Sequence, residues 1–223
     1  MNSTVKDRIE ITAADGHRLG VYRARPTGEP RGSVLIIQEI FGVTAHIKAV
    51  ADAYAEAGYE ALAPQLFDRI TPDLTVPYSD ISTGLAHAYS IDTAFIIRDL
   101  DATQRAAARP DQAATVGFCW GGRLSYQAAC RLNLKAAVIY YGGGLPSCLP
   151  ETPSCPTLFH FGEQDTAIPQ SDVEQMRTAV TTAEIHLYPA GHAFNNTDRA
   201  SYEPVSAALS LSRTLAFLQR HLG

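Results

Sequence analysis

Residues 117–122 read Gly-Phe-Cys-Trp-Gly-Gly; they follow a short apolar run, residues 113–116, and precede a segment of helical character, residues 123–132. Glycines on both sides of a nucleophile let the backbone turn sharply from a strand into a helix, because glycine adds no Cβ. The first N–H groups of that helix point at the Cys119 thiol and favour its thiolate. The stretch therefore predicts a nucleophilic cysteine; the alternative is a glycine-rich turn with a buried structural cysteine.

Length and charge limit the class of protein. With 223 residues the chain suffices for one sizeable α/β domain, which we expect to span residues 1–223. The net charge is −5 and no Lys/Arg run occurs, so we do not expect nucleic acid as a partner. Residues 1–15 lack the pattern of a signal peptide and no apolar run is long enough for a membrane helix. We therefore expect a cytoplasmic protein without a membrane partner, a monomer by default, with a homodimer as the alternative.

The cysteines argue against a structural metal. Four occur, Cys119, Cys130, Cys148 and Cys155, with no CxxC pair and no compact Cys/His cluster. Cys148 and Cys155 flank a proline-rich loop and are close enough in sequence to approach each other. In a cytosolic protein free thiols are the expected state. The sequence predicts neither a metal site nor a cofactor.

Strands alternate with helices along the chain. Residues 8–11 and 18–22, separated by Asp15-Gly16, predict an antiparallel hairpin, and the apolar run 33–37 predicts a strand buried on both faces. Further strands are expected at 59–63, 113–116, 135–140, 157–161 and 184–188, and helices at 45–57, 84–109, 123–132, 171–180 and 204–221. This pattern predicts a single-domain α/β fold, with a mostly parallel, doubly wound sheet flanked by helices and an N-terminal hairpin.

Two details of this pattern bear on the site. Residues 67–82 contain Pro72 and Pro77 and look like a loop, which makes them a candidate rim or lid. The last helix carries an apolar stripe that we expect to face the core, formed by Val205, Leu209, Leu215 and Leu218.

Two polar residues follow strands at the edge where the cysteine turn is expected. Asp165 comes after the strand 157–161, and His192 comes after the strand 184–188. A thiol nucleophile needs a base that takes its proton and an acid that orients the imidazole. The order Cys119, Asp165, His192 is that of α/β hydrolases, although each polar residue alone would also suit a turn. The six other histidines fit packing or solvated positions.

Glu39 is unexpected where it stands. It follows the apolar strand 33–37, at the position where a hydrolase usually supplies an oxyanion-hole N–H. A carboxylate after a fully apolar strand is costly to bury unless it is paired. The alternative is an exposed loop charge.

Four segments together resemble the dienelactone hydrolase (carboxymethylenebutenolidase) family of the α/β hydrolase superfamily: residues 38–43, Gln-Glu-Ile-Phe-Gly-Val; the cysteine turn 117–122; the Gly-x-x-Asp turn 162–165; and residues 191–194, Gly-His-Ala-Phe. The resemblance implies a triad of Cys119, His192 and Asp165. It also implies that Glu39 keeps the resting thiol protonated or out of line and takes its proton when substrate binds. The backbone N–H groups of Ile40 and Trp120 would form the oxyanion hole.

The implied reaction opens a lactone, or cleaves an activated ester, through a thioester acyl-enzyme and needs no cofactor or metal. The best-known family members hold a substrate carboxylate with two arginines, one before the long helix and one four residues after the histidine. Here Asn196 occupies the second position, and no arginine lies between Arg69 and Arg98. Arg69 and Arg199 lie in nearby loops and could reach in to replace them. Without the clamp, the sequence predicts the broader class of lactones and activated esters.

Residues beside the site loops are the candidates for the substrate pocket: Phe41, Tyr141, Phe194 and Asn196. Two other functions remain open. The same triad would serve a general carboxylesterase or thioesterase, and a hydrolase fold can also be kept as a non-catalytic small-molecule-binding protein.

Overall fold

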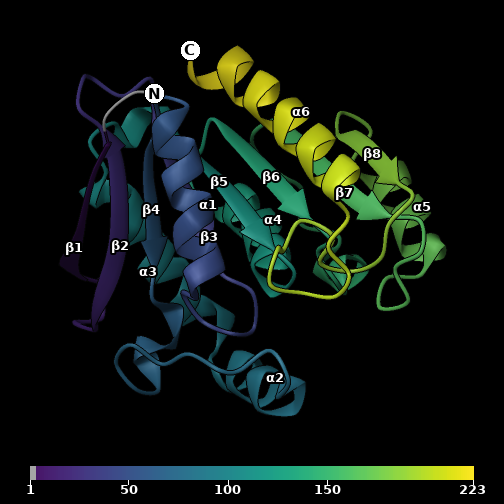
Figure 1. Ribbon diagram of the computed structural model, residues 1–223, viewed down its shortest axis with the longest axis horizontal. Helices are drawn as coiled ribbons and strands as arrows, with labels where there is room; N and C mark the ends of the chain where they lie inside the picture. The colour runs from purple at the N-terminus through teal and green to yellow at the C-terminus, as the bar shows by residue number, and fades with distance from the viewer. Residues whose placement is uncertain (1–3) are drawn as a thin grey trace.

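The central strands are apolar because both faces of the sheet are covered. The computed structural model describes residues 4–223, and its sheet runs in the order β1-β2-β4-β3-β5-β6-β7-β8 (Figure 1). Every residue of the five central strands is buried: β3 (Ser33–Ile37), β4 (Glu60–Pro64), β5 (Ala113–Phe118), β6 (Ala136–Tyr140) and β7 (Thr157–Gly162). Strands buried on both sides require apolar side chains on both faces.

The hairpin and the parallel sheet confirm the predicted fold. Strands β1 (Thr4–Thr12) and β2 (Arg18–Pro26) pair antiparallel, and β2 joins the sheet antiparallel to β4. From β4 to β8 (Glu184–Tyr188) all neighbours are parallel. The carboxyl ends of these parallel strands therefore meet at one edge of the sheet, where a ligand site is expected.

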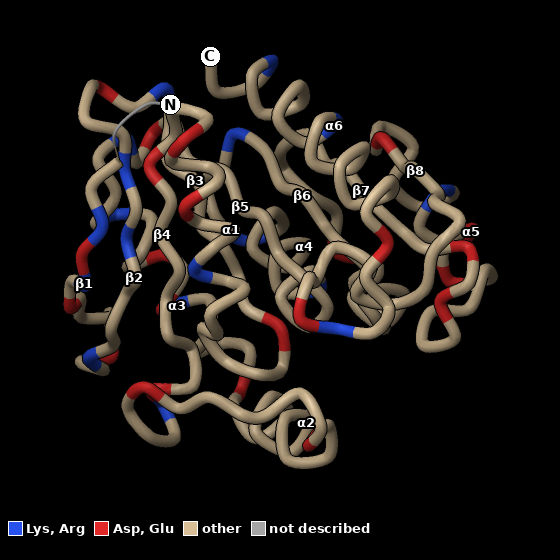
Figure 2. Tube along the Cα trace, in the orientation of Figure 1, with Lys and Arg blue, Asp and Glu red and all other residues tan. Residues whose placement is uncertain are grey.

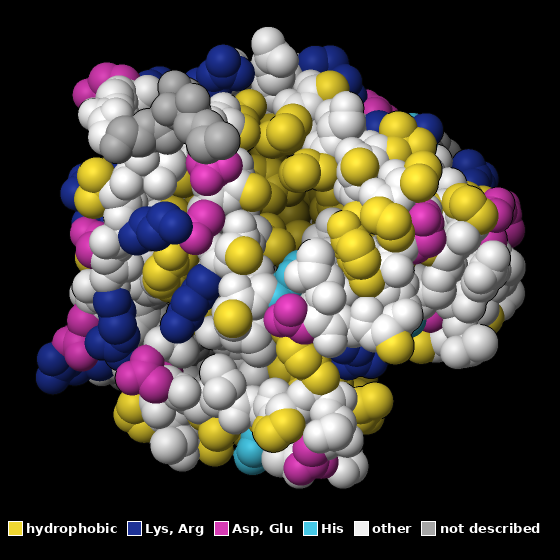
Figure 3. All heavy atoms as spheres, in the orientation of Figure 1, with side chains coloured by type: hydrophobic (Ala, Val, Ile, Leu, Met, Phe, Trp, Pro, Cys, Tyr) yellow, Lys and Arg dark blue, Asp and Glu magenta, His cyan; other side chains and the backbone are white. Residues whose placement is uncertain are grey.

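Helices cover both faces of the sheet. In Figure 1, α1 (Ala45–Glu56) and α6 (Pro204–Leu222) lie in front of it, and α3 (Thr93–Ala106) and α4 (Trp120–Arg131) lie behind it. Figure 3 shows the front face, where apolar side chains line the hollow between α1 and α6. Helix α5 (Gln170–Ala179) follows β7. Short 3₁₀ turns occur at Leu66–Arg69, Pro110–Gln112 and Leu145–Cys148.

The single long helix predicted for residues 84–109 is wrong. The structure has two helices there, α2 (Ile81–Ser90) and α3, and α2 projects away from the sheet (Figure 1). Asp92 caps α3 by accepting a hydrogen bond from the Ala94 N–H at 2.7 Å, and Asp80 caps α2 in the same way through Thr83. An aspartate N-cap starts a new helix because its carboxylate satisfies N–H groups that have no partner within the helix. The predicted rim, residues 67–82, thus ends in the first turn of α2.

The stripe predicted for α6 is half right. Leu218 is fully buried, but Val205 and Leu209 are 72% and 43% exposed. Polar side chains take part of the buried face instead. Thr214 Oγ1 lies 2.9 Å from His160 Nε2 and 2.8 Å from the Tyr140 hydroxyl. A buried imidazole needs such partners, and they displace the apolar pattern that the sequence suggested.

Surface charge and cysteine state agree with the expectations from sequence. Figure 2 shows acidic and basic residues distributed over many elements rather than gathered on one. The four cysteines are free thiols. None of the helices within residues 4–223 combines the length and apolarity needed to cross a bilayer.

Candidate active site

The turn at Cys119 is strained and tightly packed. Strand β5 ends at Phe118, Cys119 has φ +56°, and α4 starts at Trp120, three residues earlier than predicted. A left-handed conformation is unfavourable for a residue with a Cβ and persists only where the surroundings enforce it. They do so here, because a Cβ at Gly117 would collide with the Gly121 carbonyl, and one at Gly121 with the Ile37 carbonyl. The backbone contacts leave Cys119 at the carboxyl edge of the sheet.

His192 and Asp165 form a partly buried hydrogen-bonded pair. His192 Nδ1 donates to Asp165 Oδ2 at 2.7 Å, and the Asp165 side chain is fully buried. The other carboxylate oxygen accepts from the Ala167 N–H at 2.8 Å, which fixes the orientation of the carboxylate. Burial alone lowers the pKa of His192, but favourable interactions with Asp165 and Cys119 outweigh it and raise that pKa to about 10. The imidazole is therefore suited to hold a proton next to the sulfur.

Glu39 is buried rather than an exposed loop charge. Its side chain lies at the cavity wall, where Oε2 accepts a hydrogen bond from Asn196 Nδ2 at 2.7 Å. The Asn196 amide also lies 3.3 Å from the Tyr78 hydroxyl, which in turn is 3.0 Å from Thr44 Oγ1. Burial raises the pKa of Glu39, although the Asn196 bond and the charges of His192 and Arg199 oppose this effect. The carboxyl group thus binds a proton more readily than an ordinary glutamate does.

Two backbone N–H groups next to Glu39 and Cys119 in the chain are those of Ile40 and Trp120. Ile40 follows Glu39, and Trp120 is the first residue of α4. No backbone acceptor within residues 4–223 takes either N–H outside regular secondary structure. An N–H at the start of a helix has no intrahelical partner, so it is available to a ligand oxygen.

A cavity of about 360 Å³ opens above these groups. Cys119, His192 and Glu39 line it, together with apolar side chains that include Ile40, Phe41 and Trp120. Such a volume suits a small organic molecule. Among the described residues, no three His, Cys, Asp or Glu side chains group as a metal ion would require.

Two arginines also line the cavity. Arg199 stacks over the rings of Phe41 at 5.2 Å and Tyr78 at 5.6 Å, and Arg123 lies one helical turn after Cys119. No carboxylate within residues 4–223 lies at salt-bridge distance from either guanidinium group. Without such an ion pair, both guanidinium groups can still pair with an anionic ligand.

The other pocket candidates lie in different places. Phe41 lines the cavity, whereas Tyr141 and Phe194 are fully buried behind it, with the Tyr141 ring 5.1 Å from that of His192. Asn196 is also buried and holds Glu39 instead of facing the cavity. Arg69 pairs with Asp99 and Asp15 and does not line the cavity.

Sequence reasoning missed Arg123 and the residues of α2. Arg123 was discoverable, because the fourth residue after a nucleophile that starts a helix lies one turn along that helix. The α2 residues Ile81, Leu85 and Tyr89 line the cavity as well. The sequence pattern does not indicate them, because it predicts a loop up to residue 82 and one long helix after it.

Known proteins share this fold and sequence along nearly the whole chain. The profile of the dienelactone hydrolase family matches residues 19–222. Carboxymethylenebutenolidase 1 of Cupriavidus pinatubonensis is 31% identical over 96% of this chain and 97% of its own. A Synechocystis protein provisionally named a carboxymethylenebutenolidase is 34% identical over the full length of both chains.

Among solved structures, a Klebsiella pneumoniae protein provisionally assigned as a dienelactone hydrolase superposes with a TM-score of 0.86. Its sequence is 33% identical, and the match covers 98% of this chain and 99% of that one. The family profile, the relatives and this structure agree with the single α/β domain and its mostly parallel sheet. The chain belongs to the dienelactone hydrolase family.

Proposed function

We propose that this chain opens a lactone or cleaves an activated ester by attack of the Cys119 thiolate, with His192 as the base and Asp165 as the residue that orients it. Family membership already makes the chain a dienelactone hydrolase-like hydrolase of esters or lactones. The observation that carries the mechanism is the 2.7 Å bond between His192 and Asp165, which places an oriented imidazole on the same cavity wall as Cys119. Nucleophile, base and orienting acid are the three parts of a catalytic triad.

Acylation begins when the Cys119 sulfur attacks the carbonyl carbon and the C=O electrons move onto oxygen. The resulting oxyanion accepts hydrogen bonds from the backbone N–H groups of Ile40 and Trp120. Collapse re-forms the carbonyl and breaks the bond to the leaving oxygen, which takes the His192 proton as an alcohol or departs as an enolate that His192 then protonates. A thioester to Cys119 remains; when the substrate is a lactone, its leaving oxygen stays attached to the acyl group.

Deacylation uses the same groups in reverse. His192, now neutral, removes a proton from water, and the hydroxide attacks the thioester carbonyl. A second oxyanion forms and accepts hydrogen bonds from the same two N–H groups. Its collapse releases the carboxylic acid and the Cys119 thiolate. The raised pKa of His192 favours the imidazolium beside the released thiolate, and the proton that Glu39 took from the thiol returns to the sulfur, which restores the resting thiol.

Glu39 acts on the resting thiol in this proposal. Its buried carboxylate faces the same cavity as Cys119, so its negative charge disfavours a second anion on the sulfur. The raised pKa of Glu39 fits it to accept the thiol proton when a substrate arrives. Asn196, through its bond to Oε2, keeps the carboxylate in place.

The substrate carries a negative charge close to the scissile bond. Arg123 and Arg199 line the cavity without a carboxylate partner within residues 4–223, and two guanidinium groups favour a carboxylate or another anion. Neither arginine stands at the two family positions that the sequence lacks, so the anion would be held from a different side. A general carboxylesterase would have little use for this pair.

Replacing Cys119 or His192 tests the triad. We expect Cys119→Ala and His192→Ala to reduce kcat for an activated phenyl ester by about 10³-fold or more, because each removes a group on which the covalent route depends. Circular dichroism checks the fold. The matched control is Cys130→Ala, since Cys130 is a free thiol that does not line the cavity. Full activity in Cys119→Ala would exclude the cysteine mechanism.

Glu39→Gln tests the control of the thiol. Removing the negative charge should make the unliganded thiol react about 3- to 10-fold faster with iodoacetamide at neutral pH, while turnover falls because the proton acceptor is lost. The measurements are the pH profile of alkylation and kcat. Glu39→Asp, which retains the charge, is the control. An unchanged alkylation rate would mean that Glu39 has a structural role only.

The free energy of unfolding of the Glu39→Gln variant should differ from that of the wild type in a pH-dependent way. Because burial raises the folded-state pKa of Glu39 above its ordinary 4.5, the wild type loses stability as pH rises through that pKa. At about pH 7.5 the variant should be more stable by roughly 1–2 kcal/mol, and at about pH 4 the difference should disappear. Urea unfolding at the two pH values measures it. An equal stability difference at both pH values would mean that burial does not raise the pKa of Glu39.

Arg123→Met and Arg199→Met test the charge of the substrate. For a phenyl ester with a free carboxylate, we expect each variant to lower kcat/KM by about 10-fold, whereas the same ester with its carboxylate methylated should change little. Arg177→Met on α5 is the control, because Arg177 is exposed and does not line the cavity. Equal losses on both esters would argue against an anion site and favour a general carboxylesterase.

A further inference from the structure

One face of α2 presents large apolar side chains to open space. Ile81, Leu85 and Tyr89 are spaced four residues apart, so they lie one above the other on the helix. They are 46%, 40% and 72% exposed, and all three line the cavity that holds Cys119. Single exposed apolar residues are ordinary, but a continuous apolar row at the mouth of a cavity is typical of a binding surface. We call these three residues the α2 row.

The α2 row is held at a fixed distance from the reacting groups. A Cβ at Gly84 would lie 2.6 Å from the Ile40 carbonyl oxygen, so the backbones of α2 and Ile40 touch there. Gly84 and Ala88 are buried, and Asp80 caps the first turn of α2. Since Ile40 directly follows Glu39, the α2 row sits against the segment that supplies the proposed oxyanion hole. It is part of the site wall rather than an independent surface helix.

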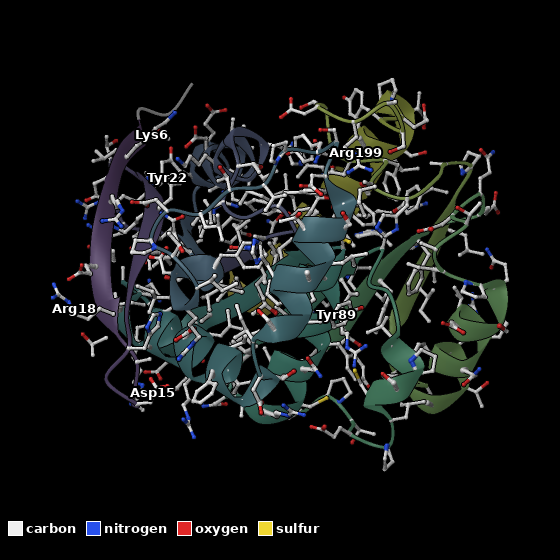
Figure 4. All side chains as sticks on the ribbon, turned by 90° about the horizontal axis from the view of Figure 1, so that it is seen from below. Lys6, Asp15, Arg18, Tyr22, Tyr89 and Arg199 are labelled. Carbon is white, nitrogen blue, oxygen red and sulfur yellow. The ribbon has the colours of Figure 1, made fainter. Side chains whose placement is uncertain are left out.

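The cavity therefore has walls of two kinds. The α2 row continues into apolar side chains deeper in the cavity, among them Ile40, Phe41 and Trp120. Arg123 and Arg199 border the same space, and Figure 4 labels Tyr89 on α2 and Arg199 on the loop after β8. A ligand that satisfies both walls has an anionic end and an apolar end.

We propose that the α2 row binds an aryl or alkyl group of the substrate, so that this enzyme selects amphipathic esters or lactones with an apolar group of about phenyl size. This inference rests on the proposed function, because it assigns the α2 row to the substrate of the Cys119 site. We assign the substrate to the α2 row because these residues and the reacting groups line one cavity. A cover of another kind, such as a second copy of the chain, would have to lie across the entrance to Cys119.

Ligand binding can be measured without any turnover. Trp120 is the only tryptophan in the chain and lines the same cavity, so its fluorescence reports occupancy. The probes are butyrate and 4-phenylbutyrate, which share a carboxylate and differ by a phenyl group. We expect wild-type protein to bind 4-phenylbutyrate at least about 10-fold more tightly than butyrate, because the phenyl group leaves water.

Variants of the α2 row then locate the phenyl group. Leu85→Asn keeps the side-chain size but makes it polar, and Tyr89→Ala removes a ring. Each should weaken 4-phenylbutyrate binding about 5-fold or more and leave butyrate binding unchanged. The matched control is Leu209→Asn on α6, because Leu209 is a helical leucine of nearly equal exposure, 43%, that does not line the cavity. It should change neither affinity.

Two results would overturn the proposal. One is equal affinity of 4-phenylbutyrate for the wild type and both α2 variants. The other is a homodimer in sedimentation that Leu85→Asn dissociates without a change in ligand affinity, which would assign the α2 row to a second copy. Both readouts are independent of catalysis. An active Cys119→Ala variant would refute the cysteine mechanism and leave the α2 result standing, so the two failures can be told apart.

Discussion

Backbone contact at the end of β5 is the constraint on which the rest of the site depends. Gly117, Gly121 and the Ile37 carbonyl approach so closely that no side chain fits between them. This packing compels Cys119 into a left-handed conformation and starts α4 immediately after it. Gly121 also packs the start of α4 against the end of β3, and β3 pairs with β5 at Ile37 and Gly117, so Cys119 and the Glu39–Ile40 segment lie close together. Close backbone packing around one strained residue thus positions the thiol relative to the Glu39 carboxyl group.

Burial gives the polar residues around Cys119 their chemical properties. His192 would lose its proton readily in a dry environment, but Asp165 and Cys119 reverse that tendency and raise its pKa. Glu39 is also buried, and within residues 4–223 only the Asn196 amide donates a hydrogen bond to its side chain, so burial raises its pKa. Shifted pKa values gathered in one cavity are typical of sites that move protons. His192 and Glu39 both line the cavity with Cys119.

In the proposed function, the side chains that line the cavity select the ester that reaches Cys119. At the two positions where the best-known family members carry arginine, this sequence has other residues. Arg123 from α4 and Arg199 from the loop after β8 nevertheless place two cations at the cavity. Helix α2, held through Gly84 against Ile40, supplies the apolar wall. In the proposed function, substrate selection depends on α2, α4 and the loop after β8, as expected when the elements around a rigid scaffold carry specificity.

The sequence alone was enough for the sheet, the turn at Cys119 and the order of Asp165 and His192, because apolar runs and glycine positions are local signals. It missed the break between α2 and α3, where a single aspartate cap outweighs helix periodicity, and the polar face of α6, which exists to satisfy His160. Only the tertiary structure decided which arginines line the cavity, that Asn196 holds Glu39, and that Tyr141 and Phe194 lie behind the wall. Those facts depend on contacts between residues far apart in the chain, and no local pattern encodes which way a side chain faces once the elements are packed.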